Sequence, residues 1–110
     1  MVGSHLNSSL GTKLTVHFSL YCTSVKALGT EKHLVDLERA YNLQDLGCFM
    51  MTEMAHGSNL QGIITTAHYL HEQRSFILNT PHETGMKFWI GNLGRTANKG
   101  VVFANLMIGE

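Results

Sequence analysis

The first part of the chain carries hydrophobic residues at the spacing of an amphipathic helix. Between Leu10 and Leu28 apolar side chains recur every three or four positions, which is typical of a helix that buries one stripe of its surface. Ser8 or Ser9 is a suitable N-cap for this helix. Gly29 follows the pattern, and we expect it to end the helix in a left-handed conformation.

A second, shorter helix is predicted after this glycine. Thr30 can cap it, and Leu34, Leu37 and Tyr41 would share one of its faces. Asn42–Asp45 then has the composition of a turn. Because two helices alone cover little apolar surface, we expect the stripe of the first helix to be exposed and to favour association. That stripe consists of Leu14, Phe18, Tyr21 and Val25.

From Gly47 onward the pattern becomes that of short strands separated by polar, glycine-containing loops. The expected strands are Cys48–Met51, Gly62–Tyr69, Ser75–Leu78, Met86–Ile90 and Gly100–Met107. The two longest polar loops are Thr52–Gly62 and Gly91–Gly100. Hairpin connections between such strands indicate an antiparallel barrel or sandwich. The fold class is therefore predicted as α+β, a short helical arm followed by a small β-domain.

Composition narrows the classes of partner. The chain has 110 residues, 44% of them hydrophobic, with eight basic and eight acidic side chains. Its balanced charge gives no basic surface for nucleic acid, and its apolar runs are far shorter than the roughly 20 residues of a membrane span. We expect neither partner. Cys22 and Cys48 are expected to be buried free thiols rather than a disulfide.

Several chemistries remain possible from residue types alone. Four histidines, His56, His68, His71 and His82, show none of the usual zinc spacings, so no metal site is expected. Cys48 and His56 could form a nucleophilic pair, although a thiol inside an apolar strand is usually inert. The segment 91–94, Gly-Asn-Leu-Gly, resembles a phosphate loop only loosely, because it lacks the third glycine and the Lys-Ser/Thr pair.

The two polar loops together favour a flavin. An isoalloxazine ring needs hydrogen-bond donors at its polar edge and an apolar or aromatic wall at the other. Residues 50–52, Met-Met-Thr, offer a hydroxyl and successive amides, and residues 88–91, Phe-Trp-Ile-Gly, offer an aromatic wall and a glycine for close approach. An alternative in which Trp89 lies in the core and Gly91 only in a turn stays open from the residues alone.

Five segments carry a resemblance to a known family. They are Cys-Phe-Met-Met-Thr-Glu (48–53), His-Gly-Ser-Asn (56–59), Thr-Thr-Ala (65–67), Asn-Thr-Pro (79–81) and Lys-Phe-Trp-Ile-Gly-Asn-Leu-Gly-Arg-Thr-Ala (87–97). In order and spacing they resemble the peroxisomal acyl-CoA oxidases, over about residues 10–110. A weaker similarity to the acyl-CoA dehydrogenases is seen at Thr52-Glu53 and at residues 87–90.

The resemblance implies a fold and an activity. Residues 1–46 would be the end of the family's N-terminal α-domain, and residues 47–110 its central antiparallel β-barrel. The parent reaction would be FAD-dependent α,β-desaturation of a fatty acyl-CoA, with oxygen as acceptor and hydrogen peroxide as product. This is a step of fatty acid β-oxidation in the peroxisome. The full-length parent would be a homodimer.

Site residues also follow from the resemblance. Thr52 and Gly91 would contact the flavin, and Phe49, Met50, Met51 and Trp89 would line its ring. Ser58 and Asn59 would approach the acyl-CoA, although Ala55 replaces a glycine usual in that loop. The family's catalytic glutamate lies in a later helical domain and has no counterpart here; neither Glu53 nor Glu83 takes that role. We therefore expect this chain to be inactive alone. The alternative is a catalytically inactive truncated isoform that binds flavin or a partner.

Overall fold

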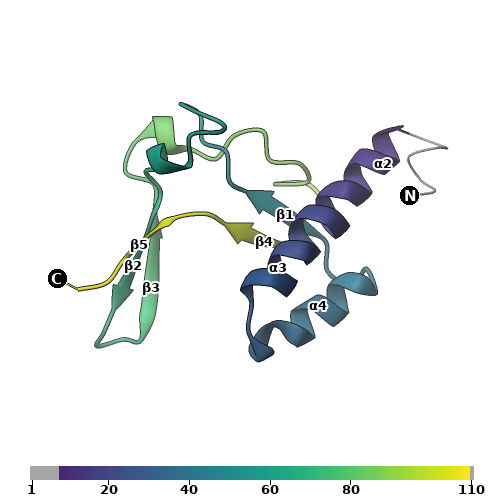
Figure 1. Ribbon diagram of the computed structural model, residues 1–110, viewed down its shortest axis with the longest axis horizontal. Helices are drawn as coiled ribbons and strands as arrows, with labels where there is room; N and C mark the ends of the chain where they lie inside the picture. Colours follow the sequence, from purple (N-terminus) through teal and green to yellow (C-terminus); the bar gives the residue numbers. More distant parts are fainter. Residues whose placement is uncertain (1–7, 110) are drawn as a thin grey trace. The chain divides into compact units, whose positions relative to one another are not determined.

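The chain divides into two compact units in the computed structural model, which describes residues 8–109. Unit 1 comprises Met1–Phe49 and Ile90–Val101, and unit 2 comprises Met50–Trp89 and Val102–Glu110. Figure 1 labels the helices and strands of both units. The domain boundary expected from the family resemblance, between residues 46 and 47, stays a prediction.

Unit 1 begins with one continuous helical segment. It runs through α2 (Ser8–Leu14), the π-helix η1 (Thr15–Cys22) and α3 (Thr23–Leu28), so the predicted helix is confirmed. Gly29 ends it differently from the prediction, with an extended backbone at φ −79° and ψ 172°. A side chain at position 29 would lie 2.4 Å from the Val25 carbonyl oxygen. The glycine therefore permits a close approach rather than a left-handed turn.

The second predicted helix is also present. The 3₁₀ helix η2 (Glu31–His33) leads into α4 (Leu34–Tyr41), and the Thr30 amide donates to His33 Nδ1 at 2.9 Å. Of the three residues expected to share a face, Leu37 is buried together with Ala40, whereas Leu34 and Tyr41 are exposed. The turn at residues 42–45 is confirmed.

The buried face of α4 forms the core of unit 1 with the long helical segment. Tyr21, Cys22, Leu37 and Ala40 are buried together, and Phe18, Val25 and Val101 pack against them. The expectation of an exposed stripe was therefore wrong for Tyr21, while the expected association stays a prediction. Of that stripe, Tyr21 is buried, Phe18 and Val25 are half-buried against this cluster, and Leu14 is half-buried outside it.

Buried His17 ties three elements of unit 1 together. Its Nδ1 accepts from the Gly47 amide at 2.9 Å, so its Nε2–H donates to the Ala40 carbonyl at 2.8 Å. Gly47 opens β1 (Gly47–Met50), which pairs with β4 (Lys99–Val102) in a two-stranded sheet. At the start of this sheet Asp45 accepts from Arg39 at 2.8 Å, and the Arg39 guanidinium lowers the pKa of that carboxyl.

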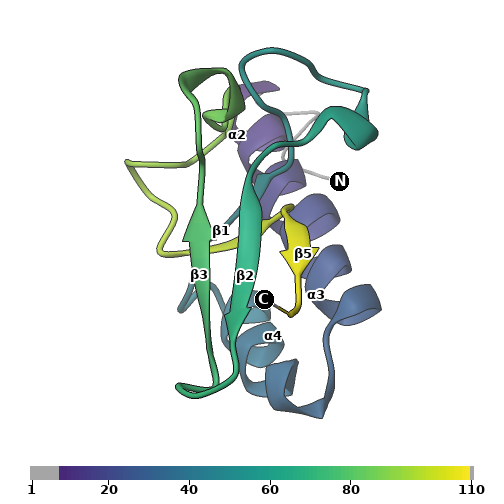
Figure 2. The same ribbon diagram turned by 90° about the vertical axis from the view of Figure 1, so that its left-hand side faces the viewer.

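Unit 2 contains a three-stranded sheet with the order β3-β2-β5 (Figure 2). β2 (Thr66–Leu70) and β3 (Ser75–Asn79) form the predicted antiparallel hairpin, whereas β5 (Asn105–Met107) runs parallel to β2. The expected all-antiparallel arrangement was therefore wrong at β5. The sheets do not close on themselves among the described residues, so a barrel is not formed by them.

Three of the predicted strands differ from the structure. The segment 62–69 begins with the 3₁₀ helix η3 (Leu60–Gly62) and becomes a strand only at Thr66. The segment 86–90 follows the 3₁₀ helix η4 (Glu83–Gly85) and is not a strand, because Trp89 has φ 65°, which lies outside the strand region. The segment 100–107 is split, since the backbone partner changes from Met50 at Phe103 to Thr65 at Asn105.

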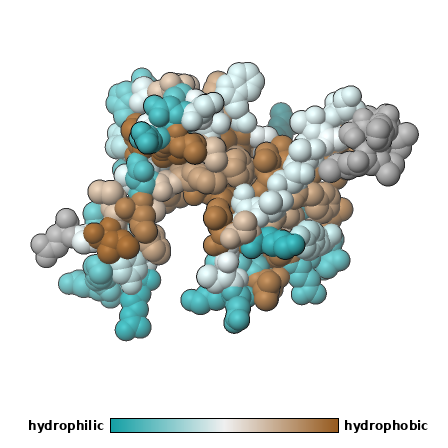
Figure 3. Space-filling model, in the orientation of Figure 1, coloured by the Kyte–Doolittle hydropathy of each residue, from teal (hydrophilic) through white to brown (hydrophobic). Residues whose placement is uncertain are grey.

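Many large apolar side chains of unit 2 remain at its surface. They include Phe76, Ile77 and Leu78 of β3 and Leu106 and Met107 of β5. Hydrophobic residues reach the surface on the face drawn in Figure 3. Within residues 8–109, no helix combines the length and the apolar character needed to cross a membrane.

Candidate functional site

The residues predicted to bind flavin are divided between the units. Phe49 and Gly91 belong to unit 1, whereas Met50, Met51, Thr52 and Trp89 belong to unit 2. Unit 2 holds most of the predicted set and brings two of its segments into direct contact.

In unit 2 the backbone around Thr52 is held on both sides by the segment that carries Trp89. The Phe88 amide donates to the Thr52 carbonyl at 2.9 Å, and Lys87 Nζ donates to the Met51 carbonyl at 3.1 Å. Among residues 8–109, neither the amide nor the hydroxyl of Thr52 makes a hydrogen bond. Two donors of one partly buried residue are therefore available to a ligand.

The residue after Thr52 is a fully buried carboxylate. Glu53 accepts from the Ile64 amide at 2.8 Å, from the Thr65 amide at 3.1 Å and from the Thr65 hydroxyl at 2.6 Å. Lys87 Nζ lies 3.3 Å from Glu53 Oε2, and His56 Nε2 lies 3.5 Å from Oε1. The side chain of Glu53 is 0% exposed and that of Lys87 is 10% exposed. They form a buried ion pair.

These contacts fix the charge state of Glu53. Burial raises its pKa, but the hydrogen bonds from Thr65, Ile64 and Lys87 outweigh burial and bring the pKa down to about 2. A carboxylate with so low a pKa, its oxygens already occupied, is a poor general base. The structure thus gives a physical reason why Glu53 does not take the catalytic role.

Trp89 is an exposed aromatic residue on a strained backbone. Its φ of 65° is unusual for a bulky residue, and its side chain is 84% exposed. Its ring meets that of Phe88 edge-on, with 5.3 Å between the centroids. The alternative that places Trp89 in the core is wrong. Strained positions of this kind often occur where a residue contacts a ligand.

The loop of unit 1 that carries Gly91 consists of turns. Asn92 and Gly94 have φ of 71° and 77°, as expected for residues in tight turns. A side chain at position 91 would come within 3.3 Å of Val16 Cγ2 in η1. Gly91 therefore packs closely against Val16, and a larger residue at position 91 would crowd that side chain.

Ser58 and Asn59, the predicted substrate residues, are exposed in the loop that precedes η3. The start of this loop is fixed, because the Glu53 amide donates to the His56 carbonyl at 3.2 Å. His56 Nε2 also bonds the Gly62 carbonyl at 2.7 Å. The loop is thus closed on itself, and both residues remain exposed on it.

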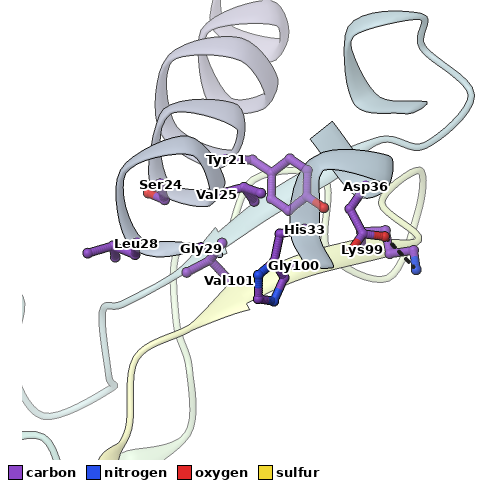
Figure 4. Close-up of a pocket in the computed structure, with 10 residues that line it drawn as sticks. All are labelled: Tyr21, Ser24, Val25, Leu28, Gly29, His33, Asp36, Lys99, Gly100 and Val101. Atoms are coloured by element: carbon purple, nitrogen blue, oxygen red, sulfur yellow. Dashed lines mark ion pairs between the residues drawn. The ribbon is translucent and has the colours of Figure 1, made fainter. Parts of the chain in front are cut away.

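A pocket of about 290 Å³ lies in unit 1, and none of the predicted site residues lines it (Figure 4). Apolar Tyr21, Val25, Leu28 and Val101 line it with polar Ser24, His33, Asp36 and Lys99. The last two form an ion pair at 3.7 Å, drawn dashed in Figure 4. This mixture of apolar, polar and charged side chains does not indicate a particular class of ligand.

Comparisons with known proteins indicate which family the chain is related to. No family model matches the chain. Human peroxisomal acyl-coenzyme A oxidase 3 is 40% identical over 102 residues, which cover 93% of this chain and 15% of that protein. Peroxisomal acyl-coenzyme A oxidase 2 of Arabidopsis thaliana is 43% identical over 108 residues, covering 97% of this chain and 16% of that protein.

The chain is homologous to a segment of the acyl-CoA oxidases. A crystal structure of acyl-CoA oxidase 1 from Yarrowia lipolytica matches with a TM-score of 0.86 and 39% identity, covering 96% of this chain and 16% of that one. Acyl-CoA oxidase-2 of Caenorhabditis elegans, bound with FAD, ascaroside-CoA and ATP, matches with a TM-score of 0.84 and 34% identity, covering 89% and 15%. The chain thus spans about one sixth of the length of these oxidases.

The structure also argues against a nucleophilic cysteine and offers no group of metal ligands among the residues it describes. Cys22 and Cys48 are free and buried, as predicted, and burial raises the pKa of both thiols, which opposes activation as a nucleophile. Among the described residues, no group of three His, Cys, Asp or Glu side chains could hold a metal ion.

Sequence reasoning missed the ion pair of Glu53 and Lys87. The available signal was a single charged residue within each of two otherwise apolar or neutral segments, Met50–Met54 and Met86–Ile90. A charge in such a position is usually buried with a partner of opposite sign.

Proposed function

We propose that this chain is the flavin-contacting segment of a peroxisomal acyl-CoA oxidase. The observation that carries the proposal is Thr52, whose amide and hydroxyl make no hydrogen bond within residues 8–109 and which is held beside the segment of exposed Trp89 in unit 2. The match to acyl-CoA oxidases over more than nine tenths of the chain supports it. FAD is the proposed cofactor, as in the Caenorhabditis elegans relative.

The donors of unit 2 fit the polar edge of a flavin. Thr52 supplies two hydrogen-bond donors, and Met50, Met51 and Trp89 supply apolar and aromatic surface. Phe49 and Gly91 are assigned to the same cofactor through the family resemblance, and Ser58 and Asn59 to the acyl-CoA. FAD held by these residues would supply the hydride acceptor for desaturation of an acyl-CoA, with oxygen as the final electron acceptor and hydrogen peroxide as the product.

The catalytic base, the complete barrel and the oligomeric state of the parent enzyme are further parts of the proposal. Glu53 is a poor candidate for the base that removes the proton next to the thioester carbonyl, since it is buried and its oxygens are occupied. We propose that the strands of unit 2 are part of a larger barrel in the complete fold and that the complete enzyme is a homodimer. The second candidate function is a catalytically inactive isoform that binds flavin or a partner, and the occupied oxygens of Glu53 are the observation that favours it.

Flavin binding is tested by titrating FAD into the purified chain and following the quenching of flavin fluorescence. Thr52→Val should weaken binding by roughly two- to tenfold, because one hydrogen bond contributes about 0.5–1.5 kcal/mol net. Thr66→Val in β2 is the matched control and should bind as the wild type does. Equal affinity of the Thr52→Val and wild-type chains would count against the assignment of Thr52.

Peroxide release with a fatty acyl-CoA separates the two candidate functions. We expect FAD binding without turnover from these 110 residues, because a missing general base alone costs typically 10²–10⁴-fold in rate. Steady peroxide production by the pure chain would contradict this and require a base among its own side chains.

A further inference from the structure

Lys87 holds three acceptors that all belong to unit 2. Its Nζ donates to the Phe103 carbonyl at 2.7 Å and to the Met51 carbonyl at 3.1 Å, and it lies 3.3 Å from Glu53 Oε2. An ammonium group has three donors, so all three are used. The group is therefore fixed in one position rather than free to sample several.

The contact with Met51 acts directly on Thr52. The Met51 carbonyl and the Thr52 amide belong to the same planar peptide group, in which C=O and N–H point in opposite directions. By binding the oxygen, Lys87 turns the Thr52 N–H away from itself. A cation on the oxygen also polarises the peptide and makes its N–H a stronger donor.

Two further contacts complete the clamp around this residue. The Phe88 amide, from the residue next to Lys87, donates to the Thr52 carbonyl at 2.9 Å. Glu53, the residue after Thr52, balances the charge of Lys87 and is itself fixed by the amides of Ile64 and Thr65. The cation can therefore stay buried next to Thr52 without an unpaired charge.

We propose that Lys87 is a positioning residue, which orients and polarises the Met51–Thr52 peptide so that the Thr52 amide binds an acceptor atom of the flavin. The inference rests on the proposed function, because it takes FAD as the ligand. It adds a role for an ion pair that does not itself touch the ligand. Lys87 acts through Thr52, and Glu53 acts through Lys87.

The test compares Lys87→Met and Lys87→Arg with the wild type. Lys87→Met should weaken FAD binding by about tenfold or more, the usual loss for a charge-assisted hydrogen bond, whereas Lys87→Arg keeps the cation and should recover most of that affinity. Lys99→Met is the matched control, since Lys99 forms a half-exposed ion pair with Asp36 in unit 1. It should bind FAD as the wild type does. Circular dichroism shows whether each variant is folded.

The amide resonance of Thr52 provides a readout that a merely structural role would not move. In the wild-type chain, FAD should shift the Thr52 amide proton far more than that of Thr66, and this measurement does not depend on any variant folding. Folded Lys87→Met should show a Thr52 proton shifted upfield even without FAD, because its peptide is less polarised.

The outcomes separate the two proposals. If the wild-type chain binds no FAD, the proposed function fails, and this inference fails with it. If the wild type binds FAD but folded Lys87→Met binds equally well, or if saturating FAD leaves the Thr52 resonance unchanged, the function stands and the role of Lys87 is refuted.

Discussion

The buried carboxylate of Glu53 makes the stability of unit 2 depend on pH in a defined direction. Its pKa falls from an ordinary value of 4.5 to about 2 in the folded chain. A group with a lowered pKa stabilises the fold above its unfolded pKa, and this contribution disappears as the pH falls toward the folded pKa. The affected window therefore runs from about pH 4.5 down to about pH 2.

The size of the effect follows from the same two values. At about 1.4 kcal/mol per pKa unit, the difference between 4.5 and about 2 corresponds to about 3 kcal/mol of unfolding free energy. This is a large share of the roughly 5–15 kcal/mol that stabilises an ordinary domain. Because Glu53 is buried, solvent does not screen most of this contribution to the unfolding free energy.

Glu53→Gln is the perturbation that isolates this contribution. At pH 7 the variant should be less stable by about 3 kcal/mol, because the amide cannot balance Lys87 and places donors against the donors of Ile64 and Thr65. Near pH 2 the carboxyl is about half protonated in the folded chain and almost fully protonated in the unfolded one, so most of the difference between the two proteins should be gone. Glu83→Gln, an exposed change in the same unit, is the control and should follow the wild type.

Two measurements check the prediction. Urea unfolding followed by circular dichroism at several pH values gives the difference in free energy between wild type and variant. The carboxyl ¹³C resonance of Glu53 gives its titration midpoint directly, expected at about 2. Parallel stability curves for wild type and Glu53→Gln across this window, or a midpoint near 4.5, would refute the reasoning.

Two further predictions concern unit 1. Gly47→Ala should destabilise it by about 1–3 kcal/mol or more, because the new Cβ would lie 2.0 Å from ring atoms of buried Tyr21; Gly57→Ala, where nothing lies within 4 Å, is the control in urea unfolding. His17→Leu should cost about 2–4 kcal/mol, because it leaves the Gly47 amide and the Ala40 carbonyl without their partner. Exposed His71→Leu should change the unfolding free energy by less than about 0.5 kcal/mol, and a similar loss in both histidine variants would contradict the role of His17.

The hydrophobic pattern predicted those helices and strands whose formation depends mainly on residues close in the sequence. The helix over residues 8–28 appears where periodicity placed it, and the hairpin of β2 and β3 is present although β2 begins only at Thr66. The π-helical middle of that helix was not predictable, because α- and π-helices differ by one residue in hydrogen-bond spacing while sharing nearly the same apolar pattern. The parallel pairing of β5 was missed for a related reason, since strand direction in a sheet depends on residues far away in the chain.

The candidate site was predictable only in part. The polar loop residues around Thr52 and the aromatic pair at 88 and 89 could be selected from residue type, and the resemblance to the oxidases assigned them to a flavin. Nothing in the sequence indicates that Phe88 bonds Thr52 or that Trp89 has a positive φ. Both features depend on the contact between two segments that lie more than thirty residues apart.

The ion pair beside Thr52 is better explained by orientation than by stability. Replacing a buried ion pair with apolar residues of similar size is often neutral or even stabilising, so stability alone gives little reason for Glu53 and Lys87 to be buried. An apolar pair could fill the same space, but it could not bind the Met51 carbonyl or turn the Thr52 amide outward. Only a fixed donor can do both, and a fixed cation needs a fixed counter-charge in the low-dielectric interior. The cost of burying two charges therefore makes sense at this position, where the peptide that they hold carries the donor proposed to meet the flavin.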